Sequence, residues 1–552
     1  MAGSVSVCRK GSISKGGSGT IMAGYSYLKT EVYNNFYEML SGALEKSEKR
    51  IAVRYRENDT IIDISYRRFV QEISSIYCFF KDKKIENRNI GIVSENRYAY
   101  LTFYLAAAFS NVIAPIDKET VDVALWEQVG QFDIAILLYT NQTKHLVASQ
   151  ARQQDVVCMN IDEMYPEMIA KAYPIASFFS DVKHVDSDKF SVLAFTSGTT
   201  GALKGAMLSQ RNVTACLRGA LQNNVLKSPS LAVLPMNHTY GFNPGILCTL
   251  YHGGTVCLTM HLKQFQRDLK AYNPYFVSLV PMVVEGMYQK ILAEARRRGK
   301  EKTLQRMVRL SNWLLKRHID IRKLLFGNLL NKRLKFISCG GAPLNPFYVE
   351  RFLEFGVYLL NGYGLTECSP LICINREFDM DPESVGTVIQ EDEVRIAEDG
   401  EILIKGPNVM LGYYKNPEET RNAMVDGYFR TGDFGYMVER RLYVTGRKKN
   451  LILLDNGKNV VPEVIEAKLQ TLPWVKECLV TTRQVKNSRI LIAFMYAPER
   501  PETAEEDLQK VNAALPAYMQ LADYVFTGQE LEKNSSRKIL REQYEEKCAD
   551  AT

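Results

Sequence analysis

The sequence predicts an α/β protein with two lobes: a large N-terminal lobe of parallel sheets with helices plus a small antiparallel barrel-like unit, and a small mobile α+β C-terminal lobe. The chain has 552 residues, which is too long for one compact core. Its residues are 46% hydrophobic, which is too apolar for a disordered chain. From residue 89 onward, short apolar runs alternate with helix-length segments. After residue 386 the apolar runs become short and alternating, which is typical of antiparallel strands.

The elements are expected in this order. Residues 1–25 are small and polar and lack the apolar core of a signal peptide, so we expect a flexible leader. The large lobe should cover 26–446, with buried parallel strands in the runs NIGIVS, VIAPID, IAILLY, VVCMNID, SVLAFTSG, LAVLPM, TVCLTM, YFVSLVP and LKFISCGG. The antiparallel unit is indicated by EVRIAEDGEILIKGP and RLYVTGRKKN. We expect a hinge at 447–450 and the small lobe over 451–552.

Composition excludes several classes of protein. No uncharged apolar run approaches the about 18 to 20 residues of a membrane-spanning helix. The eleven cysteines are scattered without a C-x-x-C pair, which favours the reducing cytoplasm over a disulfide framework or a metal cluster. The net charge is +7, but residues 296–335 alone carry +12 and the rest of the chain −5. A protein that binds nucleic acid over its whole surface is therefore not expected, and we predict no nucleic-acid partner.

The strongest local signal is FTSGTTGALKG, where an apolar strand runs into small and hydroxyl residues. Glycines let backbone N–H groups converge on an anion, hydroxyls add neutral donors, and a lysine adds charge. The pattern predicts a phosphate-binding loop, and an ordinary Ser/Gly turn is the alternative. The candidate residues are Thr196, Ser197, Gly198, Thr199, Thr200, Gly201 and Lys204.

This loop resembles the phosphate loop of the acyl-adenylate-forming superfamily, which includes acyl-CoA synthetases, adenylation domains of peptide synthetases and firefly luciferase. Four further signatures of that family follow in its order: NGYGLTEC (361–368), YFRTGDFG (428–435), GRKKNLILLDNGKNVVPEVIE (446–466) and SSRKIL (535–540). The resemblance covers residues 33–542. The runs PMNHTYGFNPGILCTLYHGG and KGPNVMLGYYKNPEET, and a helical insert before GGAP, are most similar to the long-chain fatty acid–CoA ligases.

The resemblance implies ATP, Mg²⁺ and CoA as cofactors and assigns roles to single residues. Tyr363 would stack on adenine, and Glu367, with Thr199, would hold the Mg²⁺ that bridges the ATP phosphates. Asp433 would accept hydrogen bonds from the ribose, with Arg447 as a second hold. The alternative role of Tyr363 is a buried core aromatic, and that of Glu367 is a carboxylate at the start of a helix. The alternative role of Asp433 is a turn-forming residue, and that of Arg447 is a surface arginine. The other nucleotide-site candidates are Gly341, Ala342, Pro343, Asn361, Gly362, Gly364 and Thr366.

Lys538, together with Glu367, Thr199 and His238, forms the expected catalytic set. In the resembled family a lysine at this place neutralises the carboxylate and the α-phosphate as these two anions meet. Arg537 stands where the family has glycine, and a solvated lysine on a charged tail is the alternative role. The small lobe would then turn about Lys449, and the loop 455–462 would enter, with Gly457 leaving room for pantetheine.

His238 matches a Pro-x-x-His element beside the acyl pocket of CoA ligases, and either a gate or a structural histidine fits it. Residues 236–245 contain no carboxylate, which disfavours zwitterionic substrates.

The basic segment 296–335 has apolar residues at helical spacing, Met307, Leu310, Leu314 and Leu315, with Arg and Lys between them. Such a helix can lie on an anionic membrane, so we expect a cytoplasmic protein that is in part peripheral to a membrane. A solvated face on a core-packed helix is the alternative.

The sequence therefore predicts an AMP-forming acid–thiol ligase that activates a medium- or long-chain fatty acid with MgATP and transfers the acyl group to CoA. Three alternatives stay open: a ligase that loads an acyl carrier protein, an aryl-acid CoA ligase, and a nucleotide-binding protein that has lost catalysis, for which Arg537 is the only support.

Overall fold

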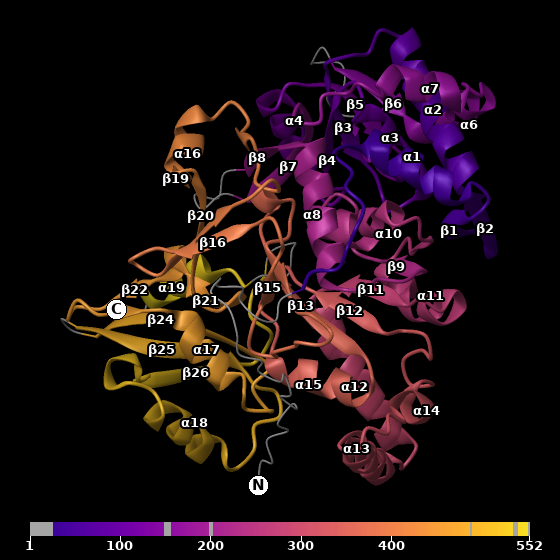
Figure 1. The fold of residues 1–552 in the computed structure, drawn as a ribbon. Helices are drawn as coiled ribbons and strands as arrows, with labels where there is room; N and C mark the ends of the chain where they lie inside the picture. Colours follow the sequence, from indigo (N-terminus) through magenta and orange to yellow (C-terminus); the bar gives the residue numbers. More distant parts are fainter. Residues whose placement is uncertain (1–25, 148–155, 198–202, 486–487, 534–538, 550–552) are drawn as a thin grey trace, which may run out of the picture.

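The fold is described from a computed structural model over residues 26–147, 156–197, 203–485, 488–533 and 539–549 (Figure 1). The large N-terminal part contains two extended sheets with helices packed around them, and the C-terminal part, orange to yellow in Figure 1, lies beside it. The predicted fold class is confirmed. The leader expected at 1–25 lies outside the described residues.

The first sheet has seven strands and is mostly parallel. In order across the sheet they are β18 (Gly412–Tyr413), β8 (Leu203–Ser209), β7 (Phe190–Ser197), β4 (Val112–Ile116), β3 (Asn89–Val93), β5 (Ile134–Tyr139) and β6 (Val157–Asn160). From β7 to β6 all neighbours are parallel, whereas β8 and β18 are antiparallel to theirs. The β-branched runs NIGIVS, VIAPID and IAILLY thus form the buried strands predicted for them.

Helices from the first half of the chain pack on this sheet and on one another. They are α1 (Phe36–Ser47), α2 (Tyr66–Asp82), α3 (Tyr98–Ala107), α4 (Asp122–Gln131), α5 (Lys144–Val147), α6 (Ile161–Ala170), α7 (Ile175–Val182) and α8 (Gln210–Asn223). All ten residues of α3, YAYLTFYLAA, are buried. A helix that is apolar all round is stable in water only inside a core, and α3 lies in the largest core of the molecule.

The second sheet has fourteen strands and changes from parallel to antiparallel. In order they are β16 (Glu393–Ile396), β17 (Glu401–Lys405), β20 (Tyr428–Val438), β21 (Arg441–Arg447), β15 (Gly386–Val388), β14 (Cys373–Ile374), β13 (Tyr358–Tyr363), β12 (Phe336–Cys339), β11 (Phe276–Leu279), β9 (Ser230–Ala232), β10 (Val256–Leu258), β1 (Ile51–Glu57) and β2 (Thr60–Ser65), with β19 (Met424–Val425) pairing β20. The strands from β13 to β1 are parallel.

The predicted antiparallel strands are present, but they continue the parallel sheet. The direction changes between β13 and β14, where Gly362 pairs with Ile374 and Tyr363 with Cys373. The box NGYGLTEC therefore lies at the junction between the two halves of the sheet.

The remaining helices of the large part lie mostly near the second sheet (Figure 1). They are α9 (Thr239–Phe242), the π-helix η1 (Asn243–Leu247), α10 (Cys248–Tyr251), η2 (Leu262–Gln264), α11 (Phe265–Tyr272), α12 (Pro281–Arg297), α13 (Glu301–Leu315), α14 (Arg322–Phe326), α15 (Pro346–Glu354), η3 (Thr366–Cys368) and α16 (Pro417–Asn422). None of the described helices is both long and apolar enough to span a bilayer.

The C-terminal part has its own sheets and its own core. It contains β22 (Ile452–Leu453), β23 (Asn459–Val460), α17 (Pro462–Leu469), β24 (Glu477–Val485), β25 (Ser488–Tyr496), α18 (Ala504–Ala513), η5 (Ala517–Met519), β26 (Asp523–Thr527) and α19 (Arg541–Ala549). Its core includes Ile465, Leu469, Val480, Met495 and Leu508. The short turn η4 (Lys448–Asn450) falls in the predicted hinge. The mobility of this part and the division of the chain at 447–450 stay predictions.

Candidate active site

The predicted phosphate loop connects β7 to β8. Thr196 and Lys204 are direct partners on this antiparallel pair, so the segment between them is a hairpin connection. Gly205 has no space for a side chain, because a Cβ there would lie 2.7 Å from both Leu193 and Phe132. The side chain of Ser197 and residues 198–202, among them Gly198, Thr199, Thr200 and Gly201, lie outside what the structure describes. Their expected roles stay predictions.

Lys204 is held between a carboxylate and an aromatic ring. Its ammonium forms an ion pair with Glu419 of α16 and lies 5.2 Å from the ring centroid of Tyr413. Only 14% of the Lys204 side chain is exposed. Asn416 caps α16 by accepting a hydrogen bond from the backbone N–H of Glu419, at 3.0 Å, which fixes the place of that residue. In the structure, the Lys204 ammonium is therefore already paired with a carboxylate.

Glu367 is a buried carboxylate in η3, directly after the box residues of β13. The Tyr413 hydroxyl donates a 2.9 Å hydrogen bond to its Oε1, and its own carbonyl accepts one from Met410, at 2.8 Å. Burial raises the pKa of Glu367, whereas the Tyr413 hydroxyl and the charges of Lys204 and Arg447 oppose the rise. Lys204 and Glu367 also share Tyr413 as a neighbour.

The carboxylate of Glu367 fits a magnesium ion shared with substrate phosphates. Mg²⁺ is commonly bound by one or two carboxylates together with phosphate oxygens and water. The described residues contain no cluster of three or more His, Cys, Asp or Glu side chains that could hold a metal on their own. Glu367 is a hard oxygen ligand with a positive group nearby for the remaining phosphate charge, which is the chemistry that MgATP requires.

Tyr363, Asp433 and Arg447 come together from three strands. The Tyr363 hydroxyl donates to Oδ2 of Asp433 at 2.7 Å, and Nε of Arg447 lies 3.4 Å from Oδ1 of the same carboxylate. Asp433 on β20 and Arg447 on β21 are direct cross-strand partners. Asp433 is buried, with only 3% of its side chain exposed, whereas Arg447 is 46% exposed. The three predicted residues thus form one cluster.

The remaining box residues shape the backbone. A Cβ on Gly364 would lie 1.9 Å from the carbonyl oxygen of Pro370, so only glycine fits between β13 and η3. Asn361 is buried and donates from Nδ2 to the carbonyl of Ser384 at 3.2 Å. Thr366 begins η3.

The segment Gly340 to Pro343 follows β12, and its first residue lies against β13. A Cβ on Gly340 would lie 3.1 Å from the carbonyl of Gly362 and 3.2 Å from the Tyr240 ring. Gly341, at φ +82°, together with Ala342 and Pro343, is exposed. This segment therefore lies between the nucleotide-site candidates on β13 and the ring of Tyr240.

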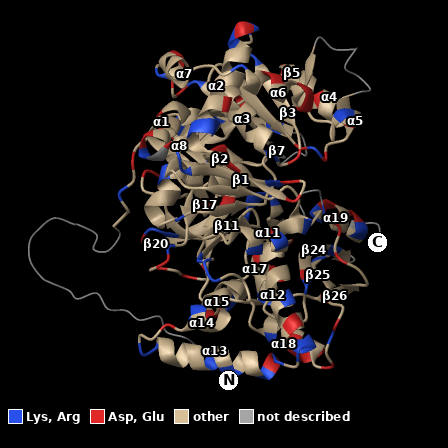
Figure 2. Ribbon diagram, turned by 90° about the vertical axis from the view of Figure 1, so that its right-hand side faces the viewer, with Lys and Arg blue, Asp and Glu red and all other residues tan. Residues whose placement is uncertain are grey.

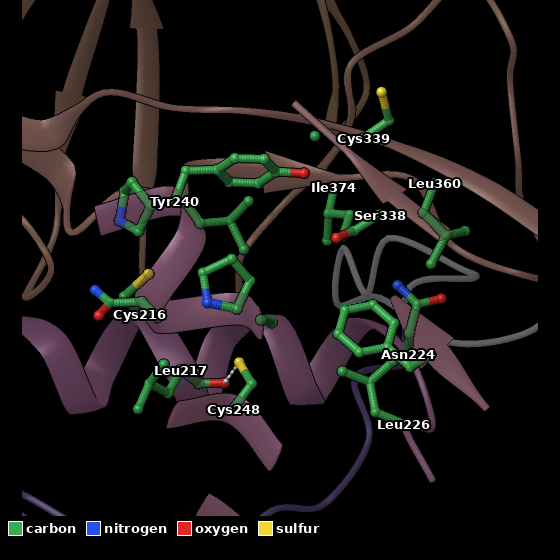
Figure 3. A pocket seen from close by; sticks show the side chains of 17 residues that line it. Cys216, Leu217, Asn224, Leu226, Tyr240, Cys248, Ser338, Cys339, Leu360 and Ile374 are labelled. Atoms are coloured by element: carbon green, nitrogen blue, oxygen red, sulfur yellow. Dashed lines mark hydrogen bonds between the residues drawn. The ribbon is translucent and has the colours of Figure 1, made fainter. Parts of the chain in front are cut away.

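An apolar cavity opens beneath this segment, between α8 and the strands β12 and β13 (Figure 3). Figure 3 shows Tyr240 on one side of it and Asn224 and Leu226 on the other, with Cys216, Leu217 and Cys248 along the helical side. Its volume is about 30 Å³, far below the several hundred Å³ of a typical ligand pocket. An acyl group would enter only if side chains moved. No charged side chain lines the cavity among the described residues.

Tyr240 separates this cavity from the site. Its hydroxyl donates to the carbonyl of Leu279 at 3.1 Å, and its ring lies against the Gly340–Gly341 backbone. His238, two residues earlier, is exposed at the start of α9 and is not among the described residues that line the cavity. The gating role expected for His238 stays a prediction, and Tyr240 is a candidate that the sequence analysis missed.

Gly457 lies at a turn between β22 and β23, with φ +75°. This turn contacts the end of the β24–β25 hairpin, where the backbone N–H of Arg489 donates to Asp455 at 2.7 Å. Lys538 lies outside the described residues. Lys533 and Ile539, on either side of residues 534–538, form an isolated antiparallel β-bridge. Burial raises the pKa of Glu285 on α12, Glu477 raises it further, and Lys476 and Lys533 lower it.

Two further residues of the site, Tyr413 and Glu419, were not predicted. Both lie in the run KGPNVMLGYYKNPEET, whose similarity to the long-chain ligases assigns no role to either residue. A tyrosine and a glutamate beside a turn carry no local signal for chemistry, because their roles depend on Glu367 and Lys204 elsewhere in the chain.

Comparisons with known proteins show which sequences and structures the chain resembles. A family model described as "AMP-binding enzyme" matches residues 41–414. A long-chain-fatty-acid–CoA ligase of Mycobacterium bovis is 31% identical over 312 residues, 52% of this chain and 52% of the relative. A 2-succinylbenzoate–CoA ligase of Bacillus cytotoxicus is 27% identical over 430 residues, 74% of this chain and 82% of the relative. The chain spans about half the length of the mycobacterial relative.

Solved structures share the fold. ATP-bound MatB from Rhodopseudomonas palustris matches with a TM-score of 0.75 at 20% identity, over 92% of this chain and 99% of that one. A fatty acyl CoA synthetase of Mycobacterium tuberculosis matches with a TM-score of 0.67 at 18% identity, over 93% and 99%.

Proposed function

Because the chain belongs to the family of AMP-binding enzymes, we propose that it is an AMP-forming acid–thiol ligase. It would activate a medium- or long-chain fatty acid with MgATP to acyl-AMP and transfer the acyl group to CoA. The observation that carries the proposal is the placement of three charged groups: Lys204 and Glu367 both contact Tyr413, and Asp433 is bonded to Tyr363, four residues before Glu367. A fixed cation, a metal-binding carboxylate and a buried carboxylate for a sugar hydroxyl are the groups that a nucleotide triphosphate requires.

In the first step an oxygen of the acid's carboxylate attacks the α-phosphorus of ATP, and pyrophosphate leaves with the electron pair of the broken bond. Asp433 would accept hydrogen bonds from the ribose, with Arg447 beside it, and the Tyr363 ring would lie against adenine. When bound, Mg²⁺ would neutralise charge at the phosphates, and Glu367 and Thr199 would hold it. Thr196 and Lys204 would hold the phosphates themselves.

Lys538 would complete this step by approaching the carboxylate and the α-phosphate. The support for this role is the order of the chain, because Lys538 stands in the run SSRKIL, the last of the five family signatures.

In the second step the CoA thiolate attacks the acyl carbonyl carbon, and AMP leaves. Splitting the reaction in two makes a poor acyl donor into a good one. We propose that the small C-terminal part turns about Lys449, withdraws Lys538 and brings in the 455–462 loop. Gly457, exposed and without a neighbour within 4 Å of a Cβ, would leave room for pantetheine.

The acid is proposed from the cavity. Its lining is apolar and its three cysteines, Cys216, Cys248 and Cys339, are buried thiols whose pKa values burial raises, so they act as small hydrophobic groups. An acid with a second charge would find no partner among the described lining residues. An aryl acid is the second candidate, because a 4-coumarate–CoA ligase of Oryza sativa is 27% identical over 68% of this chain.

CoA is the acceptor we propose, and an acyl carrier protein is the alternative. We also propose a cytoplasmic enzyme that makes peripheral membrane contact through 296–335, because long-chain acids partition into membranes. The ten described cysteines are free thiols, which suits a reducing compartment.

The test is pyrophosphate release from MgATP with short-, medium- and long-chain acids and with aryl acids, each with and without CoA. Release that is fastest with long-chain acids and rises on adding CoA supports the proposal. Release that ignores CoA and rises with an acyl carrier protein would replace the acceptor. Release with aryl acids alone would replace the substrate class, and no release with any acid would contradict ligase activity.

A further inference from the structure

Helix α13 lies along one edge of the molecule (Figure 2). Its inward face packs against the rest of the protein. Leu304, Met307 and Val308 pack against the hydrophobic core of the second sheet. Ser311 is buried, and Nδ2 of Asn312 donates to Glu354 of α15 at 3.2 Å. The opposite face is therefore not needed to hold the helix in place.

The opposite face is cationic and contains no acid. From Lys302 to Arg317 the sequence has five basic residues and no Asp or Glu. All five are exposed, and no ion pair joins them to a carboxylate of the described chain. We call this the cationic face of α13; it consists of Lys302, Arg306, Arg309, Leu310, Trp313, Lys316 and Arg317.

Neighbouring charges do not cancel the cationic face. Glu301 is 3.5 Å from Arg296, and Asp320 is 2.7 Å from Arg322, so both nearby acids are already paired. Glu294 pairs with both Arg297 and Arg298, at 2.7 and 2.5 Å, so its single charge cancels one of the two. The five basic residues of the cationic face keep their full charge, because no ion pair of the described chain includes them.

The same face exposes large apolar side chains. Leu310 is 49% and Trp313 is 52% exposed, and the following turn and helix add Ile319 at 51% and Leu324 at 82%. The Arg317 guanidinium lies 3.7 Å from the centroid of the Trp313 ring. Trp and Arg are the side chains that settle at the headgroup level of a bilayer, where the ring is partly buried and the guanidinium meets phosphate.

We propose that the cationic face of α13 docks the enzyme on an anionic lipid surface, with Trp313 and Leu310 among the headgroups. Charge alone would suit nucleic acid equally well, but four half- to largely exposed apolar side chains favour a surface with an apolar interior. The purpose of docking rests on the proposed function, since it would place a ligase where long-chain acids are dissolved. The test measures vesicle binding and does not require catalysis.

The experiment is co-sedimentation of the full chain with phosphatidylcholine vesicles, with and without phosphatidylserine. The variant carries Arg306→Gln, Arg309→Gln and Lys316→Gln. The control carries Lys227→Gln, Lys263→Gln and Lys270→Gln, three exposed lysines elsewhere with the same change in net charge. A basic residue at an anionic surface is worth about fivefold in binding, so the α13 variant should bind roughly a hundredfold more weakly than the control.

Tryptophan fluorescence tests insertion separately. The chain has three tryptophans, and the other two are buried, Trp126 at 2% and Trp474 at 8% exposure. Brominated phospholipids should therefore quench Trp313 selectively. Trp313→Ala should weaken binding several-fold more than Phe526→Ala, which removes another exposed aromatic ring that carries an arginine, Arg500, at 4.5 Å.

Three outcomes would overturn the proposal: equal binding to both kinds of vesicle, equal loss in both triple variants, or binding without quenching of Trp313. Tighter binding to duplex RNA than to anionic vesicles would also overturn it. Pyrophosphate release with a water-soluble acid should be the same in both triple variants. A failure of docking with release intact is thereby distinguished from a failure of the ligase proposal.

Discussion

The Tyr363 hydroxyl donates a 2.7 Å hydrogen bond to Oδ2 of Asp433, and this bond joins the parallel half of the large sheet to the antiparallel half. The other carboxylate oxygen of Asp433 faces Arg447 on the neighbouring strand. Asp433 is thus held from two strands at once, and a carboxylate fixed in this way is suited to accept hydrogen bonds from ribose hydroxyls.

Tyr363→Phe should therefore weaken ATP binding while the ring still covers adenine. If the loss costs about 1 to 1.4 kcal/mol of ATP binding, KM for ATP should rise roughly five- to tenfold, with kcat changed less. The measurement is initial-rate kinetics of pyrophosphate release. Tyr428→Phe is the control, because it removes a tyrosine–carboxylate bond on the same strand, to Glu393, at the surface. Equal effects of the two changes would contradict the role of the Tyr363–Asp433 bond.

The ion pair between Lys204 and Glu419 predicts competition for the lysine. If Lys204 holds phosphates, Glu419 must give up part of its contact when ATP binds. Glu419→Ala should then lower KM for ATP about threefold, since the carboxylate is partly exposed and the pair is screened. Glu418→Ala, an exposed acid on the same helix, should leave it unchanged. A higher KM in Glu419→Ala would instead show that Glu419 orients Lys204.

Tyr413 supports Glu367 through a 2.9 Å hydrogen bond, which predicts an effect on magnesium dependence. Tyr413→Phe should raise the Mg²⁺ concentration for half-maximal turnover about tenfold, the usual effect of removing a partner of a metal ligand. Glu367→Gln should raise it further. Tyr414→Phe, next in the chain and bonded to Asp133, is the control. Unchanged magnesium dependence in Glu367→Gln would remove it as the metal ligand.

The raised pKa of Glu367 also predicts a pH-dependent stability. The folded protein keeps this carboxyl protonated at pH values where the unfolded chain has released the proton. The stability that it contributes is therefore present at low pH and is lost as the pH rises through the folded-state pKa.

Without nucleotide, Glu367→Gln should thus gain in free energy of unfolding relative to the parent protein as the pH rises, and the difference should vanish in acid. Urea unfolding across this pH range measures it. Glu418→Gln, at an exposed site, should show no such trend. A difference independent of pH would mean that Glu367 is not held in its neutral form by burial.

Local chemistry made the fold class predictable. Val- and Ile-rich runs form the buried strands β3 and β4, but the expected buried strand in VVCMNID is an edge strand, β6, with Val157 54% exposed. Gly364 of NGYGLTEC marks a place where the backbone tolerates no side chain. The continuation of the parallel sheet into the antiparallel strands was not predictable, because it depends on pairing between β13 and β14 and not on the strands themselves.

Tyr413 and Glu419 were not predictable for the same reason. Tyr413 is 46 residues from Glu367, and Glu419 is 215 residues from Lys204. Each pair acts only through its partner, and neither tyrosine nor glutamate is unusual at a turn. Tyr240 gives no local signal either, because a tyrosine beside a histidine, here His238, carries the less distinctive chemical group. In the structure the ring and not the imidazole lies against the Gly340–Gly341 backbone.

Lys538→Ala separates the two half-reactions. The lysine is proposed to neutralise charge only where the carboxylate meets the α-phosphate, so its loss should slow acyl-AMP formation by about a thousandfold. Thioester formation from supplied acyl-AMP and CoA involves no such meeting of anions and should be nearly unaffected. Lys533→Ala, near the base of the same segment, is the control for the placement of that segment, since Lys533 pairs with Glu477 and Glu530. A comparable loss of both half-reactions in Lys538→Ala would mean that the residue supports the small lobe as a whole and would remove its assigned part in adenylation.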